Sequence, residues 1–384
     1  MTKVLIATDK PFAPVAVKGI REIVETQGYE LALLEKYTSP EELIAAVADV
    51  DAMIIRSDKA TKEVIDAAKK LKVIVRAGAG YDNIDLQACT DHGVVAMNTP
   101  GQNSNAVAEL VFGMAVYLAR NFYNGKSGHE LKGKKIGVFV GVMYNNYQLL
   151  ALDQYQKDGE TAVNTSFSAI ANRVSYFFDF HGESMAIDTM CSSSITALYS
   201  AFQSMKCGDI EGAIVGGVNL SLHYMKYLAL SNGNFMSSDG RCKAFGANGD
   251  GYVPGEGVGA IYLKTLKKAL EDGDHVYGLV KSVALNHGGH TNGFTVPNPN
   301  AQAEVIKEAW RKAKIDPRTI TCIEGHGTGT SLGDPIEITG LSKAFMEYTD
   351  ELGFCSIGSV KSNIGHLESA AGMAGITKVL LEMK

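Results

Sequence analysis

Four short apolar runs divide the first hundred residues and limit what this part of the chain can fold into. They are KVLIA (3–7), DAMIIRS (51–57), VIVRAG (73–78) and VVAMNT (94–99). Each has the length of a strand, and helical patterns lie between them. The segment 39–50 begins with Ser39 as N-cap, Pro40 at the first helical position and Glu42 closing a capping box. Strands separated by such helices form parallel β-α-β units, so an α/β domain is expected.

Composition and charge exclude several classes of protein. The chain has 384 residues, of which 46% are hydrophobic and 20% charged, as in soluble proteins of two or three domains. A net charge of -6 without any basic run argues against a nucleic-acid partner. There is no secretory signal and no apolar run long enough to span a membrane. The six cysteines form no C-x-x-C pair, so no metal site and a reducing, cytoplasmic setting are expected.

Several stretches of the first third are similar to one enzyme family. They are IIRS (54–57), VRAGAGYDNIDL (75–86), MNTPGQNSNAVAEL (97–110) and LKGKKIGVF (131–139). Together they resemble the N-terminal part of D-3-phosphoglycerate dehydrogenase, in the D-2-hydroxyacid dehydrogenase family, over residues 2–139. The resemblance implies a flavodoxin-like domain, with Arg56, Ser57 and Gly78 in a substrate cleft and a helix over 104–120.

The cofactor-binding part of such a dehydrogenase is missing from the sequence. A dinucleotide fold needs G-x-G-x-x-G directly after KKIGVF (134–139), where this chain continues as VGVMYNNYQ (140–148). The one similar pattern, GEGVGA (255–260), leads into IYL, which is typical of a strand rather than a helix. NAD binding is therefore not expected, and Arg56, Ser57 and Gly78 are expected to be vestigial.

Beyond about residue 137 the sequence becomes rich in glycine and small residues. The segment 188–209 begins with polar capping residues and continues as a buried helix, and 212–221 reads as a strand. Cys191 lies at the start of that helix. A lone cysteine is more often a buried packing residue, but one on the first turn of a helix is placed where the dipole favours the thiolate. His326 and His366 lie in glycine-rich turns, from which they could donate to a substrate carbonyl.

The later part of the chain resembles a second family through seven stretches. They are FVGVMYNNYQ, ANRVSYFFDFHG, DTMCSSS, GRCKAFGANGDGYVPGEGVG, NHGGHTNGFTVPNPNAQ, EGHGTGTSLGDPIE and KSNIGHLESAAG. These resemble the β-ketoacyl synthase family, and most nearly the ketosynthase domains of modular polyketide synthases, over residues 137–384. The resemblance implies a thiolase-like α/β/α condensing domain. The predicted domains are therefore 1–137, the dehydrogenase-like fragment, and 138–384, the ketosynthase fragment.

The resemblance to ketosynthases also implies an activity and its residues. The activity is a decarboxylative Claisen condensation of acyl thioesters, as in polyketide and fatty-acid biosynthesis. Cys191 would be the acylated nucleophile, His326 and His366 would hold the extender thioester, and Lys361 and Glu368 would orient and polarise the site. The acyl and malonyl groups would arrive as phosphopantetheine thioesters on an acyl carrier protein, with no other cofactor. A homodimer is compatible with this interpretation.

Segments that ketosynthases normally carry at both ends are absent from this sequence. The chain is therefore predicted to be a fusion of two fragments, whose condensing activity is impaired by truncation. Two alternatives remain open: a fragment of an NAD-dependent D-3-phosphoglycerate dehydrogenase of serine biosynthesis, or a fusion without catalysis. Selective alkylation of Cys191 would favour the condensing enzyme, and NADH oxidation would favour the dehydrogenase.

Overall fold

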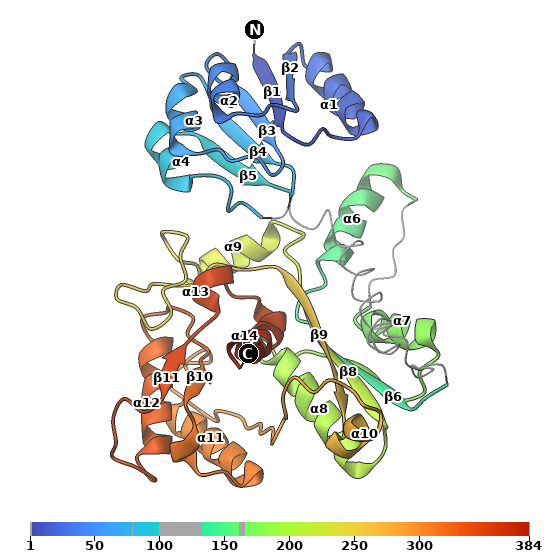
Figure 1. The fold of residues 1–384 in the computed structure, drawn as a ribbon, viewed down its shortest axis with the longest axis vertical. Coiled ribbons are helices and arrows are strands. Elements are labelled where there is room, and N and C mark those ends of the chain that lie inside the picture. Colours follow the sequence, from blue (N-terminus) through green and yellow to red (C-terminus); the bar gives the residue numbers. More distant parts are fainter. Residues whose placement is uncertain (1, 79, 100–132, 161–165, 384) are drawn as a thin grey trace. The chain divides into compact units, whose positions relative to one another are not determined.

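The chain divides into two compact units, Met1–Leu110 and Val111–Lys384. The computed structural model describes residues 2–78, 80–99, 133–160 and 166–383, drawn as a coloured ribbon in Figure 1. Each unit has its own sheet and its own hydrophobic cores. The predicted boundary at residue 137 stays a prediction. Over the described ranges, no helix combines the length and the apolar character that crossing a membrane requires.

In its described residues, the N-terminal unit contains a parallel five-stranded sheet with the order β2-β1-β3-β4-β5. The strands are β1 (Lys3–Thr8), β2 (Glu30–Glu35), β3 (Ala52–Ile55), β4 (Val73–Arg76) and β5 (Val95–Asn98). The helices between them are α1 (Pro14–Thr26), α2 (Pro40–Ala46), α3 (Lys62–Ala67) and α4 (Leu86–His92). This parallel sheet with helices between its strands agrees with the predicted α/β class, and the flavodoxin-like assignment stays a prediction.

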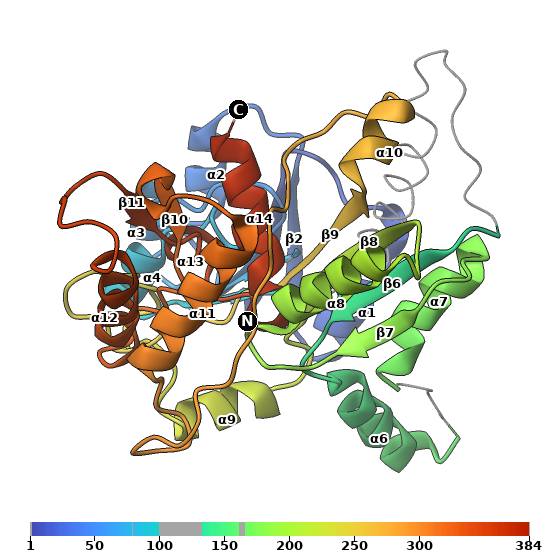
Figure 2. The same ribbon diagram turned by 90° about the horizontal axis from the view of Figure 1, so that it is seen from below.

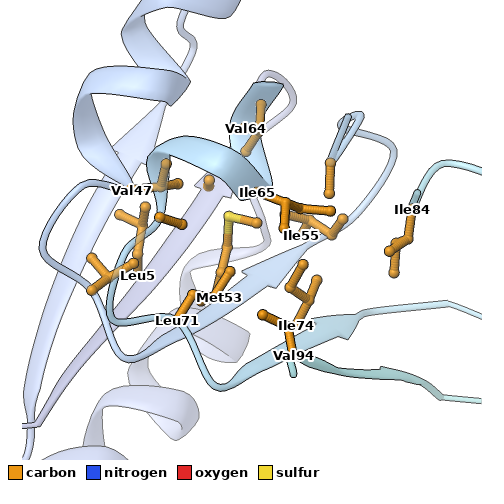
Figure 3. Close-up of a cluster of buried hydrophobic side chains, with 14 of the residues drawn as sticks. Leu5, Val47, Met53, Ile55, Val64, Ile65, Leu71, Ile74, Ile84 and Val94 are labelled. Atoms are coloured by element: carbon orange, nitrogen blue, oxygen red, sulfur yellow. The ribbon is translucent and has the colours of Figure 1, made fainter. Parts of the chain in front are cut away.

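Successive residues of the central strands point to opposite faces of the sheet and pack in two different hydrophobic cores. On β1, Leu5 packs with Met53 and Val47 on one face of the sheet, in the core that Figure 3 shows. The neighbouring residues Val4 and Ile6 lie on the other face of the sheet, where they pack against Val24 of α1. Both faces are therefore covered by helices, as the near-continuous apolar runs require.

The predicted elements of this unit form, all with shorter bounds except β1, which extends one residue further to Thr8. All four apolar runs become strands, and α2 carries the predicted capping box at Ser39. This helix ends at Ala46 instead of residue 50, and Val47 and Val50 are fully buried in the core. The sequence interpretation omitted β2. This strand lies at the edge of the sheet, and only Leu31 is buried while its neighbours are partly or fully exposed. The predicted helix over 104–120 lies outside the described residues.

The described part of the C-terminal unit has a mixed four-stranded sheet with the order β7-β6-β8-β9. The strands are β6 (Ile136–Gly141), β7 (Ser184–Ile187), β8 (Gly212–Asn219) and β9 (Gly257–Lys264). The first three are parallel, and β9 is antiparallel to β8. Most of the GEGVGA pattern lies in β9, so the residues directly after it continue a strand instead of beginning the helix that a nucleotide phosphate would need.

Helices cover both faces of this second sheet. The helix α8 (Ser193–Cys207) and α14 (Ala371–Glu382) pack with Phe139 and Val215 on one face. On the other face α7 (Ser168–Phe178) packs with Ile136 and Val138, and Figure 2 shows α7 and α8 on opposite sides. Three α/β/α layers result, as predicted.

The remaining elements of this unit lie around the sheet. The helices are α6 (Asn146–Asp158), α9 (Met225–Asn232), α10 (Leu266–Glu271), α11 (Pro299–Ala313), α12 (Gly333–Phe345) and α13 (Lys361–Ile364). Two short 3-10 helices are η2 (Pro317–Thr319) and η3 (Glu368–Ala370), and a parallel pair of strands is formed by β10 (Cys322–Glu324) and β11 (Ser356–Gly358).

Candidate active site

Cys191 lies in the tight turn between β7 and α8. The Asp188 carboxylate accepts the N–H of Met190 (3.0 Å), and the Ser193 hydroxyl donates to the Met190 carbonyl (2.5 Å). Met190 adopts a left-handed backbone with φ of 56°, which is uncommon for a side chain of this type. The sequence predicts Cys191 on the first turn of the helix. This placement is wrong, because these bonds hold the turn open and α8 begins only at Ser193, after Ser192 as N-cap.

The surroundings of Cys191 favour the thiol. Burial, followed by the negative charge of Glu368, raises the pKa of Cys191 to about 11. Lys361, the backbone N–H of Cys191 itself and Lys226 act in the opposite direction but do not prevail. The expected stabilisation of a resting thiolate is therefore not found. The group is half-buried and protonated at neutral pH.

His326 follows β10 in a loop that two carboxylates of α12 hold in place. Glu337 accepts the backbone N–H groups of His326 (2.5 Å) and Gly327 (2.8 Å). Asp334 accepts the N–H of Gly329 (3.1 Å). Gly329 has φ of 71°, and a Cβ there would lie 2.7 Å from the Lys243 backbone nitrogen, so only glycine fits. Both carboxylates lie within the EGHGTGTSLGDPIE motif, but sequence reasoning assigned them no role.

His366 is fully buried and held by backbone and side-chain bonds. Its N–H donates to the Val253 carbonyl (2.7 Å), and its own carbonyl accepts from Gly255 (2.8 Å). The ring Nδ1 accepts the backbone N–H of Glu368 at 3.0 Å. A neutral ring whose Nδ1 accepts must carry its proton on Nε2. That Nε2 is buried and has no hydrogen-bond partner among the described residues, so it is a donor without an acceptor.

The two imidazoles lie close together and are both neutral. Their ring centroids are 5.4 Å apart and their planes nearly perpendicular. Desolvation, and then the positive charge of Lys361, lowers the pKa of His326 to about 4, although the side chain is still reached by solvent. Desolvation, followed by the electrostatic effects of His326, Lys361 and Lys226, lowers the pKa of His366 well below its ordinary value. Both rings therefore offer neutral N–H groups at physiological pH.

Lys361 and Glu368 connect the histidines to the thiol. Lys361 is buried at the start of α13, and its charge acts on Cys191 and on both imidazoles. Glu368 is fully buried at the start of η3, two residues beyond His366, and its charge reaches Cys191. The five predicted catalytic residues thus interact as one group. Their roles stay predictions.

A sixth residue, which is charged, belongs to this group and was missed by sequence reasoning. Lys226, on α9, forms an ion pair with Glu368 in which both side chains are fully buried. The signal in the sequence was a lone lysine inside the otherwise apolar stretch YMKYLAL (224–230).

The dehydrogenase-like residues lie in the N-terminal unit and form no comparable group. Arg56 and Ser57 follow β3 and are exposed, and Gly78 follows β4. The Arg76 side chain bonds the Arg56 carbonyl (3.0 Å) and occupies the space beside Gly78, where a Cβ would lie 2.1 Å from its Nη1. The three residues thus come after the ends of β3 and β4, and their place in a substrate cleft stays a prediction.

Comparison with known proteins identifies the second part of the chain. Residues 122–269 match the family "Beta-ketoacyl synthase, N-terminal domain", and residues 277–384 match "Beta-ketoacyl synthase, C-terminal domain". Polyketide synthase PksL of Bacillus subtilis is 64% identical over 265 residues, which are 69% of this chain and 6% of PksL. Polyketide synthase ThaG of Burkholderia thailandensis is 54% identical over 261 residues, 68% of this chain and 5% of ThaG.

Solved structures give the same result. An oxazolomycin ketosynthase domain from Streptomyces albus has a TM-score of 0.63 and 54% identity, over 65% of this chain and 43% of that one. The ketosynthase from module 6 of the bacillaene synthase of Bacillus subtilis has a TM-score of 0.62 and 43% identity, over 66% and 43%. The chain therefore belongs to the β-ketoacyl synthase family, as a polyketide synthase ketosynthase domain with the thiolase-like α/β fold.

These matches confirm the predicted class of enzyme and leave other expectations open. They give no support to the dehydrogenase resemblance of residues 2–139. The chain spans about 6% of the length of PksL and 43% of the length of the solved ketosynthase chains.

Proposed function

We propose that this chain catalyses a decarboxylative Claisen condensation between an acyl thioester and a malonyl thioester, both carried on an acyl carrier protein. The observation that carries the proposal is the His366 imidazole. Its Nδ1 is occupied by the Glu368 N–H, and its Nε2–H has no partner among the described residues, next to a second neutral imidazole, His326. A buried donor without an acceptor is costly to folding, which suggests a role in binding.

In the first half-reaction Cys191 becomes acylated. Its sulphur attacks the thioester carbonyl, the carrier's C–S bond breaks, and the proton of the thiol ends on the released carrier thiol. Because the resting group is a thiol, the proton must leave as the new bond forms. Lys361 favours the developing thiolate, since its positive charge is the largest of the influences that lower the pKa of Cys191.

In the second half-reaction the malonyl thioester loses CO2. The electrons of the broken C–C bond enter the enolate, whose oxygen becomes negative and accepts from the Nε2–H of His366 and from the His326 ring. Fixed donors in a site with little water stabilise such an oxygen more strongly than water does. The enolate carbon then attacks the acyl-Cys191 carbonyl, and the C–S bond breaks to release a β-ketoacyl thioester. The Cys191 thiolate that leaves takes up a proton from water and becomes the resting thiol again.

Two measurements separate these half-reactions. Acylation is followed as the mass added to Cys191 by an acyl thioester, and decarboxylation as labelled CO2 released from a malonyl thioester. We expect Cys191→Ala to abolish the first, and His326→Ala or His366→Ala to slow the second by about 100- to 1000-fold while leaving some acylation. Normal decarboxylation in both histidine variants would refute the proposal.

For the N-terminal unit we propose descent from the substrate domain of a D-3-phosphoglycerate dehydrogenase, without dehydrogenase activity. The strand order 2-1-3-4-5 and the position of Arg56, Ser57 and Gly78 after β3 and β4 support this origin. We expect no saturable binding of NADH below millimolar concentrations in a calorimetric titration. A micromolar dissociation constant, or oxidation of NADH with hydroxypyruvate phosphate, would contradict it. A cytoplasmic location and a homodimer remain predictions.

A further inference from the structure

The burial pattern of α9 is inverted. Its apolar residues Met225, Tyr227 and Leu228 are 47%, 39% and 50% exposed, whereas Lys226 is only 3% exposed. Lysine is almost never buried unless it is paired, because removing its charge from water is costly. Leu230, one turn further on, is 6% exposed, so the buried face of α9 carries this lysine beside one apolar side chain.

Every N–H of the Lys226 ammonium has an acceptor. Besides the Glu368 carboxylate, these are the Asn219 side-chain oxygen (3.2 Å) and the Ser221 hydroxyl (3.0 Å). The ammonium also lies 4.5 Å from the centre of the Tyr144 ring, a favourable cation–π distance. An ammonium has three donors, so this one is fully satisfied and fixed in direction.

Glu368 is fixed from several sides as well. Its Oε2 accepts from Lys226 and from the Asn219 amide (2.9 Å), and its Oε1 accepts from the Tyr252 hydroxyl (3.3 Å). The ring of Tyr252 also contacts His366, with 4.8 Å between ring centroids. The Glu368 backbone has φ of 46°, which is strained for a residue other than glycine and persists only where its surroundings hold it.

The residue with this strained backbone, Glu368, is also the one whose N–H donates to His366. The Glu368 N–H that donates to His366 Nδ1 is held in direction by the same side chain that Lys226 anchors. If the Glu368 side chain were released, the backbone could relax toward an ordinary φ and the N–H would turn away from the ring. His366 could then bind the proton on Nδ1, and the Nε2 donor would be lost.

We propose that Lys226 is a positioning residue for the decarboxylation step: through Glu368 it holds His366 in the tautomer that presents Nε2–H to the enolate oxygen. The inference rests on the proposed function and adds to it a residue outside the cysteine-histidine-histidine set. Lys226 acts through Glu368 and touches no reacting atom.

A merely structural ion pair would affect both half-reactions alike, so the ratio of decarboxylation to Cys191 acylation is the decisive readout. The variants are Lys226→Met, Glu368→Gln and the double variant, which removes both charges and keeps the volumes. Lys264→Met is the matched control, since Lys264 is another shielded lysine, paired with Asp272 (2.6 Å) and Asp274 in the same unit.

We expect Lys226→Met, Glu368→Gln and the double variant each to lower the ratio by about tenfold, without a further loss in the double variant, because residues acting through one another are not additive. Lys264→Met should leave the ratio unchanged. An unchanged ratio in Lys226→Met or in Glu368→Gln, or a double variant whose loss is the product of the single losses, would overturn the proposal. If Lys226→Met does not fold, comparison of Glu368→Gln with the double variant makes the same decision.

A spectroscopic measurement separates this inference from the proposed function. In the full chain with 15N-labelled histidine, NMR should show His366 protonated on Nε2 only, with assignment from His366→Ala. In the folded Lys226 or double variant the Nδ1 resonance should move toward that of a mixture of tautomers. A single Nε2–H tautomer in those variants overturns the inference even if condensation is real. The shift without any decarboxylation in the unmodified chain would instead refute the proposed function alone.

Discussion

Asp58 in the N-terminal unit and His366 in the C-terminal unit satisfy their buried polar atoms in opposite ways. In the N-terminal unit the buried Asp58 carboxylate accepts from Asp9 N–H (2.8 Å), the Tyr37 hydroxyl (2.6 Å) and Arg56 N–H (3.3 Å). Each carboxylate oxygen of Asp58 therefore has at least one hydrogen-bond donor. In the C-terminal unit His366 Nε2 has no partner in the described residues, and the pKa values of both histidines and of the thiol are displaced. The Asp58 network also displaces a pKa, that of Tyr37, which burial and Asp58 raise, but the Tyr37 hydroxyl has its acceptor. A buried donor without an acceptor, beside displaced pKa values, is what points to work on a ligand.

The largest effect that would sharpen this contrast is the loss of one imidazole. His366→Ala or His326→Ala should slow malonyl decarboxylation by about 100- to 1000-fold, the usual result of removing one donor from an oxyanion site. The measurement is labelled CO2 release, normalised to the amount of Cys191 that accepts an acyl group. Rates within tenfold of the unmodified chain would show that the unpaired Nε2 is not the working donor.

The next effect concerns the thiol. Because the pKa of Cys191 is raised to about 11, its thiolate fraction should grow by about 100-fold between pH 7 and pH 9. Alkylation of Cys191 by iodoacetamide, followed by peptide mapping, should rise accordingly without a plateau. A plateau below pH 9 would mean that the thiolate is stabilised after all.

The same reasoning revises the expectation of selective alkylation. Cys207 and Cys322 are exposed, whereas Cys191 is half-buried and protonated, so we expect the two exposed residues to react with iodoacetamide first at pH 7. A substrate thioester, which the site would orient, is therefore the better probe of Cys191.

Two carboxylates, Glu337 in the C-terminal unit and Asp58 in the N-terminal unit, allow an effect on catalysis to be compared with an effect on stability. Glu337→Ala removes the acceptor of the His326 and Gly327 N–H groups, and should lower decarboxylation by about tenfold through misplacement of the ring. Asp58→Ala removes a comparable acceptor in the N-terminal unit. It should lower the free energy of unfolding of that unit by about 2 kcal/mol or more, and leave decarboxylation unchanged. Equal effects on decarboxylation would erase the distinction between the two networks.

The smallest expected effect is that of mild acid. With the pKa of His326 at about 4 and that of His366 also low, decarboxylation should lose only about a tenth of its rate between pH 7 and pH 5. Rings with the ordinary value of about 6.5 would lose nearly all of it. The free energy of unfolding should also fall as the pH falls. Below about pH 6.5 the two histidines bind protons in the unfolded chain but remain neutral in the folded one, which favours the unfolded state.

Local features were predictable from the sequence. Continuous apolar runs gave the strands, and the Ser39, Pro40 and Glu42 pattern gave the start of α2, because a capping box involves only neighbouring residues. The position of Cys191 was displaced because the Asp188 and Ser193 side chains compete with the helix for the backbone groups of the turn.

Long-range pairings were not predictable in this way. Lys226 and Glu368 are far apart in the sequence, and nothing in the stretch around either residue indicates the other. The glycine-rich turns singled out the two histidines, and their place in a cysteine-histidine-histidine site came from a family resemblance. Their tautomers and displaced pKa values arise from burial and from Lys361, which a linear pattern does not contain.

The central claim is that Cys191 is the nucleophile of a working condensing site, and acyl transfer tests it most directly. The chain is incubated with an acyl thioester at neutral pH, and peptides are mapped by mass spectrometry beside Cys191→Ala as control. The account predicts one acyl group, on Cys191, and none in the variant. An adduct on Cys207 or Cys322 instead, or no adduct on the folded chain, would contradict it.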